Sequence, residues 1–262
     1  MTPSSLDAIF AAEIKVKIME KREIVYKYIK ADSRGGANHG WLMAKHSFSF
    51  ANYYDPERVH FGALRVLNDD IVAPSEGFGK HPHDNMEIIT IPLKGELRHE
   101  DSIGNSSVIT AGEIQVMSAG SGIFHSEMNN SAQSNVQLLQ IWVFPNEKGV
   151  IPRYDQKRVN PESVKNQLLN VIQPKGENNP HAIWIHQNAW FYVGEFDSDR
   201  VENYRTRNID NGIYIFVIEG EVRVQNYLLS KRDALAVVNA SELSLEISKG
   251  AKILVMEVPI KW

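Results

Sequence analysis

Short apolar segments alternate with turn-forming residues from residue 24 to residue 143. Each segment is roughly four to eight residues long, which is the usual length of a β-strand. Strands are expected at residues 61–67, 87–93, 107–110, 114–117 and 137–144, with turns at 68–70, 94–95 and 111–113. Short, evenly spaced strands of this kind predict a sandwich, a jelly roll or a barrel.

The pattern changes at residues 145–180, where five prolines fall. This stretch is expected to be a linker with one short helix near residues 161–168, for which Asn160 is a suitable N-cap. The β pattern then resumes, with strands expected at residues 182–185, 189–193, 214–218 and 252–258. The second half of the chain is therefore also predicted to be β.

A weak internal repeat relates the two halves. Residues 91–98 resemble residues 217–223, and both read as strand, glycine turn, strand. Two copies of one β-barrel in a single chain are the simplest explanation. We expect an all-β protein with few short helices, divided into an extension (1–22), a first barrel (23–150), a linker (151–180) and a second barrel (181–262).

The first 21 residues have the pattern of an amphipathic helix. Apolar side chains fall at helical spacing at Leu6, Ile9, Phe10, Ile14 and Ile18. Charged residues interrupt any apolar stretch, so the segment is not a signal peptide. Met19 could itself be a natural start, which would leave residues 1–18 as an extension outside the fold. A helix that docks on the fold is the alternative.

Two motifs in the first half place candidate metal ligands two residues apart. They are His81-Pro82-His83 and His125-Ser126-Glu127. Residues i and i+2 of a strand point to the same face, so each pair can present both side chains to the barrel interior. A single pair of this kind is often an ordinary surface pair. Two pairs on facing strands instead predict a centre with three histidines and one carboxylate.

This ligand set suits a divalent transition metal with positions left open for substrate. Fe(II) is the first choice, and Cu, Ni, Co, Mn and Zn are alternatives. The chain contains no cysteine, which excludes a disulfide scaffold, a cysteine-based zinc site and a thiol nucleophile. Any metal must therefore be held by His, Asp or Glu.

Two further residues are candidates for a supporting role. Glu87 follows His83 by four residues, and strand alternation would place it on the same face as the two histidines. It could be a ligand, a hydrogen-bond partner of a ligand or a base that positions substrate. His99 is expected to be structural or to support a ligand. Several apolar residues could line a pocket or simply pack in the core: Phe48, Phe50, Met86, Phe124 and Trp142.

Composition limits the range of functions. The net charge is -4, and no basic run suggests nucleic-acid binding. No stretch approaches the roughly 18 apolar residues of a membrane span. The absence of cysteine is consistent with a cytoplasmic location. Two packed barrels need no further partner to bury their cores, so a monomer is expected.

The chain resembles the pirin family of two-barrel cupin proteins, and within it the bacterial pirin-like quercetin 2,3-dioxygenases. The matching segments are residues 34–41, 48–55, 81–87, 99–105 and 117–127. The resemblance implies two cupin domains with a metal only in the first, held by His81, His83, His125 and Glu127. It places Glu87 outside the ligand set.

The repeat alignment agrees about the second domain. It sets Thr206 and Asn208 opposite the first histidine pair, and Leu245 and Ile247 opposite the second motif. Residues of these types do not make a metal site, so none is expected there.

The activity implied by the resemblance is opening of the flavonol heterocycle with O2 and release of carbon monoxide. The substrate would be a small aromatic or enol compound. Glu127, alone or with Glu87, would accept the proton of its 3-hydroxyl group. One alternative is a metal-binding, redox-responsive regulatory protein of the pirin type. Another is a cupin isomerase or a dioxygenase with a different substrate.

Overall fold

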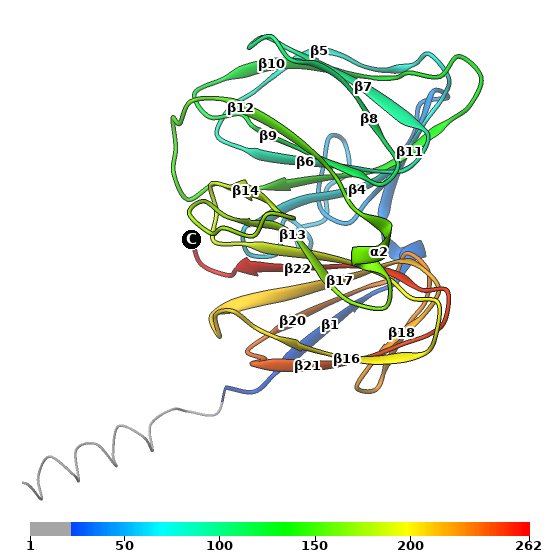
Figure 1. Ribbon diagram of the computed structural model, residues 1–262, viewed down its shortest axis with the longest axis vertical. Helices are drawn as coiled ribbons and strands as arrows, with labels where there is room; N and C mark the ends of the chain where they lie inside the picture. The colour runs from blue at the N-terminus through cyan, green and yellow to red at the C-terminus, as the bar shows by residue number, and fades with distance from the viewer. Residues whose placement is uncertain (1–21) are drawn as a thin grey trace, which may run out of the picture.

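Two β-barrels lie one above the other in the computed structural model, which describes residues 22–262 (Figure 1). The predicted all-β class with two cupin barrels is confirmed, because strands make up nearly all of the regular structure. The helix expected within residues 1–21 lies outside the described residues. Neither of the two short helices within residues 22–262 could cross a membrane.

Each barrel consists of a seven-stranded and a four-stranded sheet, and all strand pairs are antiparallel except β13 with β14, which is parallel. In the first barrel the large sheet has the order β12-β9-β6-β11-β4-β3-β2 and the small sheet has the order β5-β10-β7-β8. The strands of the large sheet are β2 (Gly35–Asn38), β3 (Leu42–His46), β4 (Leu64–Val72), β6 (Glu87–Lys94), β9 (Glu113–Ser118), β11 (Val136–Val143) and β12 (Arg153–Arg158). Those of the small sheet are β5 (Gly77–His83), β7 (Glu96–Asp101), β8 (Ser106–Thr110) and β10 (Ile123–Asn129).

The second barrel repeats this plan. Its large sheet has the order β1-β20-β17-β22-β15-β13-β14 and its small sheet the order β16-β21-β18-β19. The large sheet contains β1 (Val25–Ile29), β13 (Leu169–Pro174), β14 (Ile183–Ile185), β15 (Trp190–Glu195), β17 (Asn211–Glu219), β20 (Ala234–Val238) and β22 (Lys252–Pro259). The small sheet contains β16 (Arg200–Arg205), β18 (Val222–Val224), β19 (Tyr227–Leu229) and β21 (Glu242–Ile247). Two short helices complete the described chain, η1 (Ala31–Ser33) and α2 (Pro161–Val164).

The two large sheets pack against each other through a shared hydrophobic core. Side chains such as Ile89 and Ile141 of the first barrel meet side chains such as Phe216 and Met256 of the second in one buried cluster. Alternate residues of the same strands point the other way, into their own barrel. β6 is therefore buried on both faces, which explains its nearly continuous apolar sequence.

The strand pairings extend both barrels beyond the boundaries expected from the sequence. β1 pairs with β20 and so belongs to the second barrel, although it precedes the whole first barrel in the chain. Within the expected linker, β12 joins the first large sheet and β13 joins the second. Asn160 caps α2 as predicted, accepting a hydrogen bond from the backbone N–H of Glu162, but the helix ends at Val164 rather than near residue 168.

The turn predicted at residues 68–70 is wrong, since β4 runs through them and pairs with both β3 and β11. The polar side chains of this stretch are buried or bonded to other parts of the chain. Asn68 Oδ1 lies 2.9 Å from His46 Nδ1, and Asp70 is buried. Asp69 lies 3.3 Å from Arg34 and 3.3 Å from Arg232. Tertiary contacts therefore override the turn preference of Asn and Asp.

The carboxylate of Asp69 links three parts of the chain. It belongs to β4 of the first barrel, Arg34 follows η1, and Arg232 precedes β20 of the second barrel. All three side chains are largely buried. A carboxylate between two buried guanidinium groups is hard to replace, because its loss leaves both cations unpaired in a region of low dielectric.

We therefore expect Asp69→Asn to lower the free energy of unfolding by about 3 kcal/mol. Urea denaturation followed by intrinsic fluorescence measures this change. Asp32→Asn is the control, because Asp32 is exposed in η1 and its substitution is expected to change stability by less than about 0.5 kcal/mol. Equal, small effects in both variants would contradict the structural role of Asp69.

Candidate metal centre

Strand β10 lies between β5 and β7, and this pairing brings the candidate residues together. His125 is directly opposite His81 of β5 on one side and Asp101 of β7 on the other. Glu127 is directly opposite His99 of β7. The two predicted ligand pairs thus lie on adjacent strands of one sheet rather than on strands that face each other. Cross-strand neighbours of this kind have Cβ atoms about 5 Å apart, so their side chains meet.

The donor atoms form two groups that share His125. Those of His81, His83 and His125 lie within 4.8 Å of one another, and so do those of His99, His125 and Glu127. The ring centroids of His81 and His125 are 4.4 Å apart, and those of His83 and His125 are 4.9 Å apart. Ligand distances near 2.1 Å set donors around one ion roughly 3 to 4 Å apart, so both groups approach the spacing of a metal centre.

The protonation of the histidines also suits a metal ion. Burial, and then repulsion from His81 and His83, lowers the pKa of His125 to about 2. Burial lowers the pKa of His83 to about 4 in the same way. The imidazoles of His125 and His83 are therefore neutral, which is the form that binds metal. His81 Nδ1 donates to the carbonyl of Gly79 at 2.7 Å, leaving Nε2 as the free donor atom.

Both ring nitrogens of His125 are buried and have no hydrogen-bond partner among residues 22–262. Buried polar atoms are nearly always satisfied in folded proteins. A metal ion at this point would give one of the two nitrogens a partner. The residues present therefore fit a metal ion.

Glu127 is held inside the first barrel by hydrogen bonds from two side chains of the large sheet. Thr90 Oγ1 donates to its carboxylate at 3.1 Å, and Gln140 Nε2 donates to it at 2.6 Å. Burial raises the pKa of Glu127 to about 7. Asp70 is nearby on β4, where burial and then repulsion from Asp69 and Glu127 raise its pKa to about 8. Two carboxyl groups in a poorly hydrated space favour a cation between the sheets.

His99 is part of this centre, with a partner that sequence reasoning missed. Its ring is fully buried, and Asp101 Oδ2 lies 3.2 Å from Nε2. The signal was present, because His99 and Asp101 form a third pair at i, i+2 spacing. Thr90 and Gln140 were also missed, since nothing in the sequence shows which residues of a distant strand will meet Glu127.

The expectation that Glu87 shares a face with His81 and His83 is wrong. β5 ends at His83, and the chain turns at Asn85, whose φ is 44°. β6 then begins at Glu87 in the other sheet. Its carboxylate accepts a hydrogen bond from Ser118 Oγ at 2.7 Å, and burial raises the pKa of Glu87 to about 7. Glu87 and Thr90 are three residues apart on β6, so their side chains point to opposite faces of the sheet. Thr90 contacts Glu127 inside the first barrel, and Glu87 therefore points toward the second barrel.

Aromatic side chains form one wall beside the histidines. The ring centroid of Trp142 is 4.8 Å from that of His83, and that of Phe50 is 5.3 Å from Trp142. Met86 packs in the same cluster as Trp142. The other two candidates for this wall lie elsewhere: Phe48 in the core between the barrels and Phe124 on the surface.

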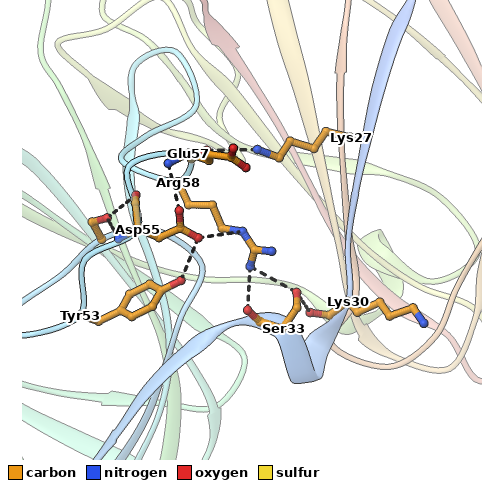
Figure 2. Close-up of polar contacts among 8 residues, drawn as sticks. Lys27, Lys30, Ser33, Tyr53, Asp55, Glu57 and Arg58 are labelled. Carbon is orange, nitrogen blue, oxygen red and sulfur yellow. Dashed lines mark hydrogen bonds and ion pairs between the residues drawn. The ribbon is translucent and has the colours of Figure 1, made fainter.

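The loop that carries Phe50 is hydrogen-bonded to residues 27–33. Figure 2 shows these contacts, which Glu57 and Arg58 make. Arg58 Nη1 donates to the carbonyl of Ser33 at 2.8 Å. Lys27 Nζ donates to the carbonyl of Glu57 at 3.1 Å. Because β1 belongs to the second barrel, that barrel helps to fix the aromatic wall of the centre in the first.

Comparison with known proteins agrees with this geometry. The model of the Pirin family matches residues 28–143, and that of the Quercetinase C-terminal cupin domain matches residues 171–258. Quercetin 2,3-dioxygenase of Escherichia coli K12 is 40% identical over 230 residues, which cover 88% of this chain and 97% of that protein. The chain belongs to the pirin family.

Solved pirin structures have the same fold. The crystal structure of YhhW from Escherichia coli is 37% identical, with a TM-score of 0.85 over 91% of this chain and 100% of that one. The structure of bacterial pirin YhhW in complex with nickel(II) is 38% identical, with a TM-score of 0.84 over 90% of this chain and 99% of that one.

At the positions of the second barrel that the repeat sets opposite the candidate ligands, this pirin has Thr206, Asn208, Leu245 and Ile247. Leu245 and Ile247 are buried in its hydrophobic core. Thr206 donates its hydroxyl to the carbonyl of Ala240 at 2.6 Å. The turns at Gly95 and Gly220 correspond, with φ values of 78° and 76°, as the internal repeat predicts.

The raised pKa of Glu127 predicts a pH dependence of stability in the metal-free protein. Its pKa is about 7 when folded against 4.5 in the unfolded chain, so the folded state binds the proton more tightly. This contribution is fully present below pH 4.5 and is lost as the pH rises through about 7. The loss amounts to ~3 kcal/mol.

Glu127→Gln has no such proton to lose. Its stability relative to that of the unmodified protein should therefore rise by ~3 kcal/mol between pH 4.5 and pH 7. Urea denaturation of both chelator-treated proteins across this range measures the difference. A difference that does not change with pH would contradict the assignment.

Proposed function

We propose that this pirin is a metal-dependent dioxygenase that opens the heterocycle of flavonols such as quercetin with O2 and releases carbon monoxide. In this proposal His81, His83, His125 and Glu127 hold one divalent transition-metal ion. The observation that carries the proposal is the convergence of three partly or fully buried imidazoles, of which His125 also belongs to a second donor group with Glu127. The names of the relatives support the same chemistry.

Fe(II) remains the first choice of metal. A few histidines with one carboxylate, and positions left open, are typical of non-haem iron oxygenases. When bound, the ion supplies a Lewis acid that stabilises the anion of the substrate hydroxyl. Nickel(II), which the YhhW complex contains, is compatible with the same donors.

Glu127 is the residue proposed to accept the proton of the substrate hydroxyl. Its carboxylate lies beside the histidines, and a carboxylate within hydrogen-bond reach of the substrate hydroxyl can act as a general base. Thr90 and Gln140 hold the carboxylate in position. Glu87 takes no part in this step, because it faces the other barrel.

The aromatic wall is proposed to hold the planar rings of the substrate. Trp142 and Phe50 lie beside His83, so a ligand near the metal centre would stack against them. Their apolar surface also keeps water away from the reacting centre.

Elemental analysis and a carbon monoxide assay test the proposal together. We expect one metal ion per chain after purification without added metal, and carbon monoxide when quercetin is added under O2. His125→Ala should remove both, because it deletes the ligand shared by both donor groups. The exposed His39 provides the control, and His39→Gln should retain both. Bound metal without carbon monoxide would rule out the flavonol reaction and favour a regulatory role or another substrate.

Trp142→Ala tests the aromatic wall separately. Loss of a stacking partner worth about 1 to 1.5 kcal/mol should raise KM for quercetin roughly tenfold. The affinity for the metal should stay within about twofold, because the indole is not a donor. Steady-state kinetics and metal titration measure the two effects. An unchanged KM would show that the substrate does not bind against this wall.

A further inference from the structure

We propose that a cavity between the two barrels binds a small apolar molecule that carries one carboxylate, with the carboxylate against Arg232. None of the candidate metal ligands lines this cavity. The inference therefore goes beyond the proposed function and does not depend on it.

The cavity has a volume of about 420 Å³, and both barrels line it. The first barrel contributes the end of β6 and the turn before β9, and the second contributes parts of β15, β17 and β22. α2, which lies between the barrels in Figure 1, adds Val164. Small-molecule sites usually measure roughly 300 to 1,000 Å³. The cavity is therefore large enough for a ligand.

Much of its wall is apolar. The wall includes Leu93, Ile114, Val159, Val164, Val193 and Ile218. Leu93, Val159 and Val193 are only partly buried against the shared core of the two barrels. They leave apolar surface that a ligand can cover, and covering it is favourable because it removes that surface from water.

Arg232 is the polar group that points to a carboxylate. It lines the cavity, and its Nη1 is buried without a hydrogen-bond partner among residues 22–262. Its Nε lies 3.3 Å from Asp69 Oδ2, and the same oxygen lies 3.3 Å from Arg34 Nη2. Nη1 of Arg34 is also buried and unpartnered within this part of the chain. Two guanidinium groups thus share one carboxylate, and a second carboxylate would balance the charge that is left over.

The acidic residues that line the cavity cannot supply that second carboxylate, because each already has a cation. Glu113 pairs with Arg158 at 3.4 Å, Glu195 with Lys252 at 2.9 Å and Glu219 with Lys231 at 2.9 Å.

The charge around the cavity therefore favours an anionic ligand. Lys94 also lines the cavity and has no ion-pair partner within residues 22–262. Lys94 and the shared Asp69 each leave one positive charge unbalanced, and complementary charge is what an anion needs. A carboxylate is favoured over a phosphate, because one charge is left over at the buried guanidinium groups and the surrounding wall is apolar.

Isothermal titration calorimetry of the full chain with naphthoate and with decanoate tests the inference. We expect a single binding event per chain for at least one of the two acids. Naphthalenemethanol has the same rings as naphthoate but no carboxylate, and it should bind at least about tenfold more weakly. Tighter binding of naphthoate would identify an aromatic acid as the ligand, and tighter binding of decanoate a fatty acid. If neither acid binds, or if the alcohol binds as well as the acid, the proposal is wrong.

Arg232→Gln tests the contact with the carboxylate. It should weaken binding of the acid about tenfold or more, because the ligand loses a charged partner. Arg205→Gln, at an exposed arginine of β16 in the same barrel, should leave the affinity within about twofold. Equal affinities in the two variants would show that Arg232 does not hold the carboxylate.

Val159→Trp tests the cavity without touching the ion pairs of Arg232. The indole would fill the space and should abolish binding of the acid. Val201→Trp is the matched control, because Val201 is 62% exposed on β16 and lies outside the cavity. Unchanged binding in Val159→Trp would show that the acid does not bind between the barrels.

His125→Ala separates this site from the candidate metal centre, since a carboxylate can also bind a metal ion. The variant should bind the acid within about twofold of the unmodified protein, because the two sites share no residue. Loss of binding in His125→Ala would place the acid at the metal centre and overturn the proposal. Retained binding in a variant that has lost its metal would leave this site standing whatever the fate of the proposed function.

Discussion

The pairing of β10 with β5 on one side and β7 on the other is the constraint on which the candidate centre depends. It sets His81 opposite His125, and His99 opposite Glu127. Strand alternation then turns all of these side chains into the barrel. A slip of one residue in either pairing would turn the ligands outward and put polar surface residues in their place. The register of three short strands therefore decides whether this pirin has a metal centre.

The rest of the structure holds that small sheet in place and buries several of the residues around the candidate ligands. The large sheet of the first barrel contributes Thr90 and Gln140, which reach across the barrel to Glu127. The second barrel covers the outer face of the large sheet through the shared core and fastens the loop that carries Phe50. Burial then supplies the chemistry, since it keeps His125 neutral and brings the pKa of Glu127 to about 7.

Local patterns in the sequence predicted what depends on strand periodicity. The all-β class, the two barrels and the i, i+2 geometry of both ligand pairs follow from residues close together in the chain. Predictions failed where a distant contact decides the conformation. Asp69 remains in a strand because Arg34 and Arg232 surround it. Glu87 faces the other barrel because the chain turns at Asn85, and the crossing of β1 into the second barrel leaves no local signal.

The most direct test of the metal centre is anomalous X-ray diffraction from crystals of the protein loaded with Fe(II) or Ni(II). We expect a single anomalous peak about 2.1 Å from a ring nitrogen of His125, inside the first barrel. His81, His83 and Glu127 should be in the same coordination sphere. A peak at any other place in the chain, or full metal loading with no peak beside His125, would contradict this assignment.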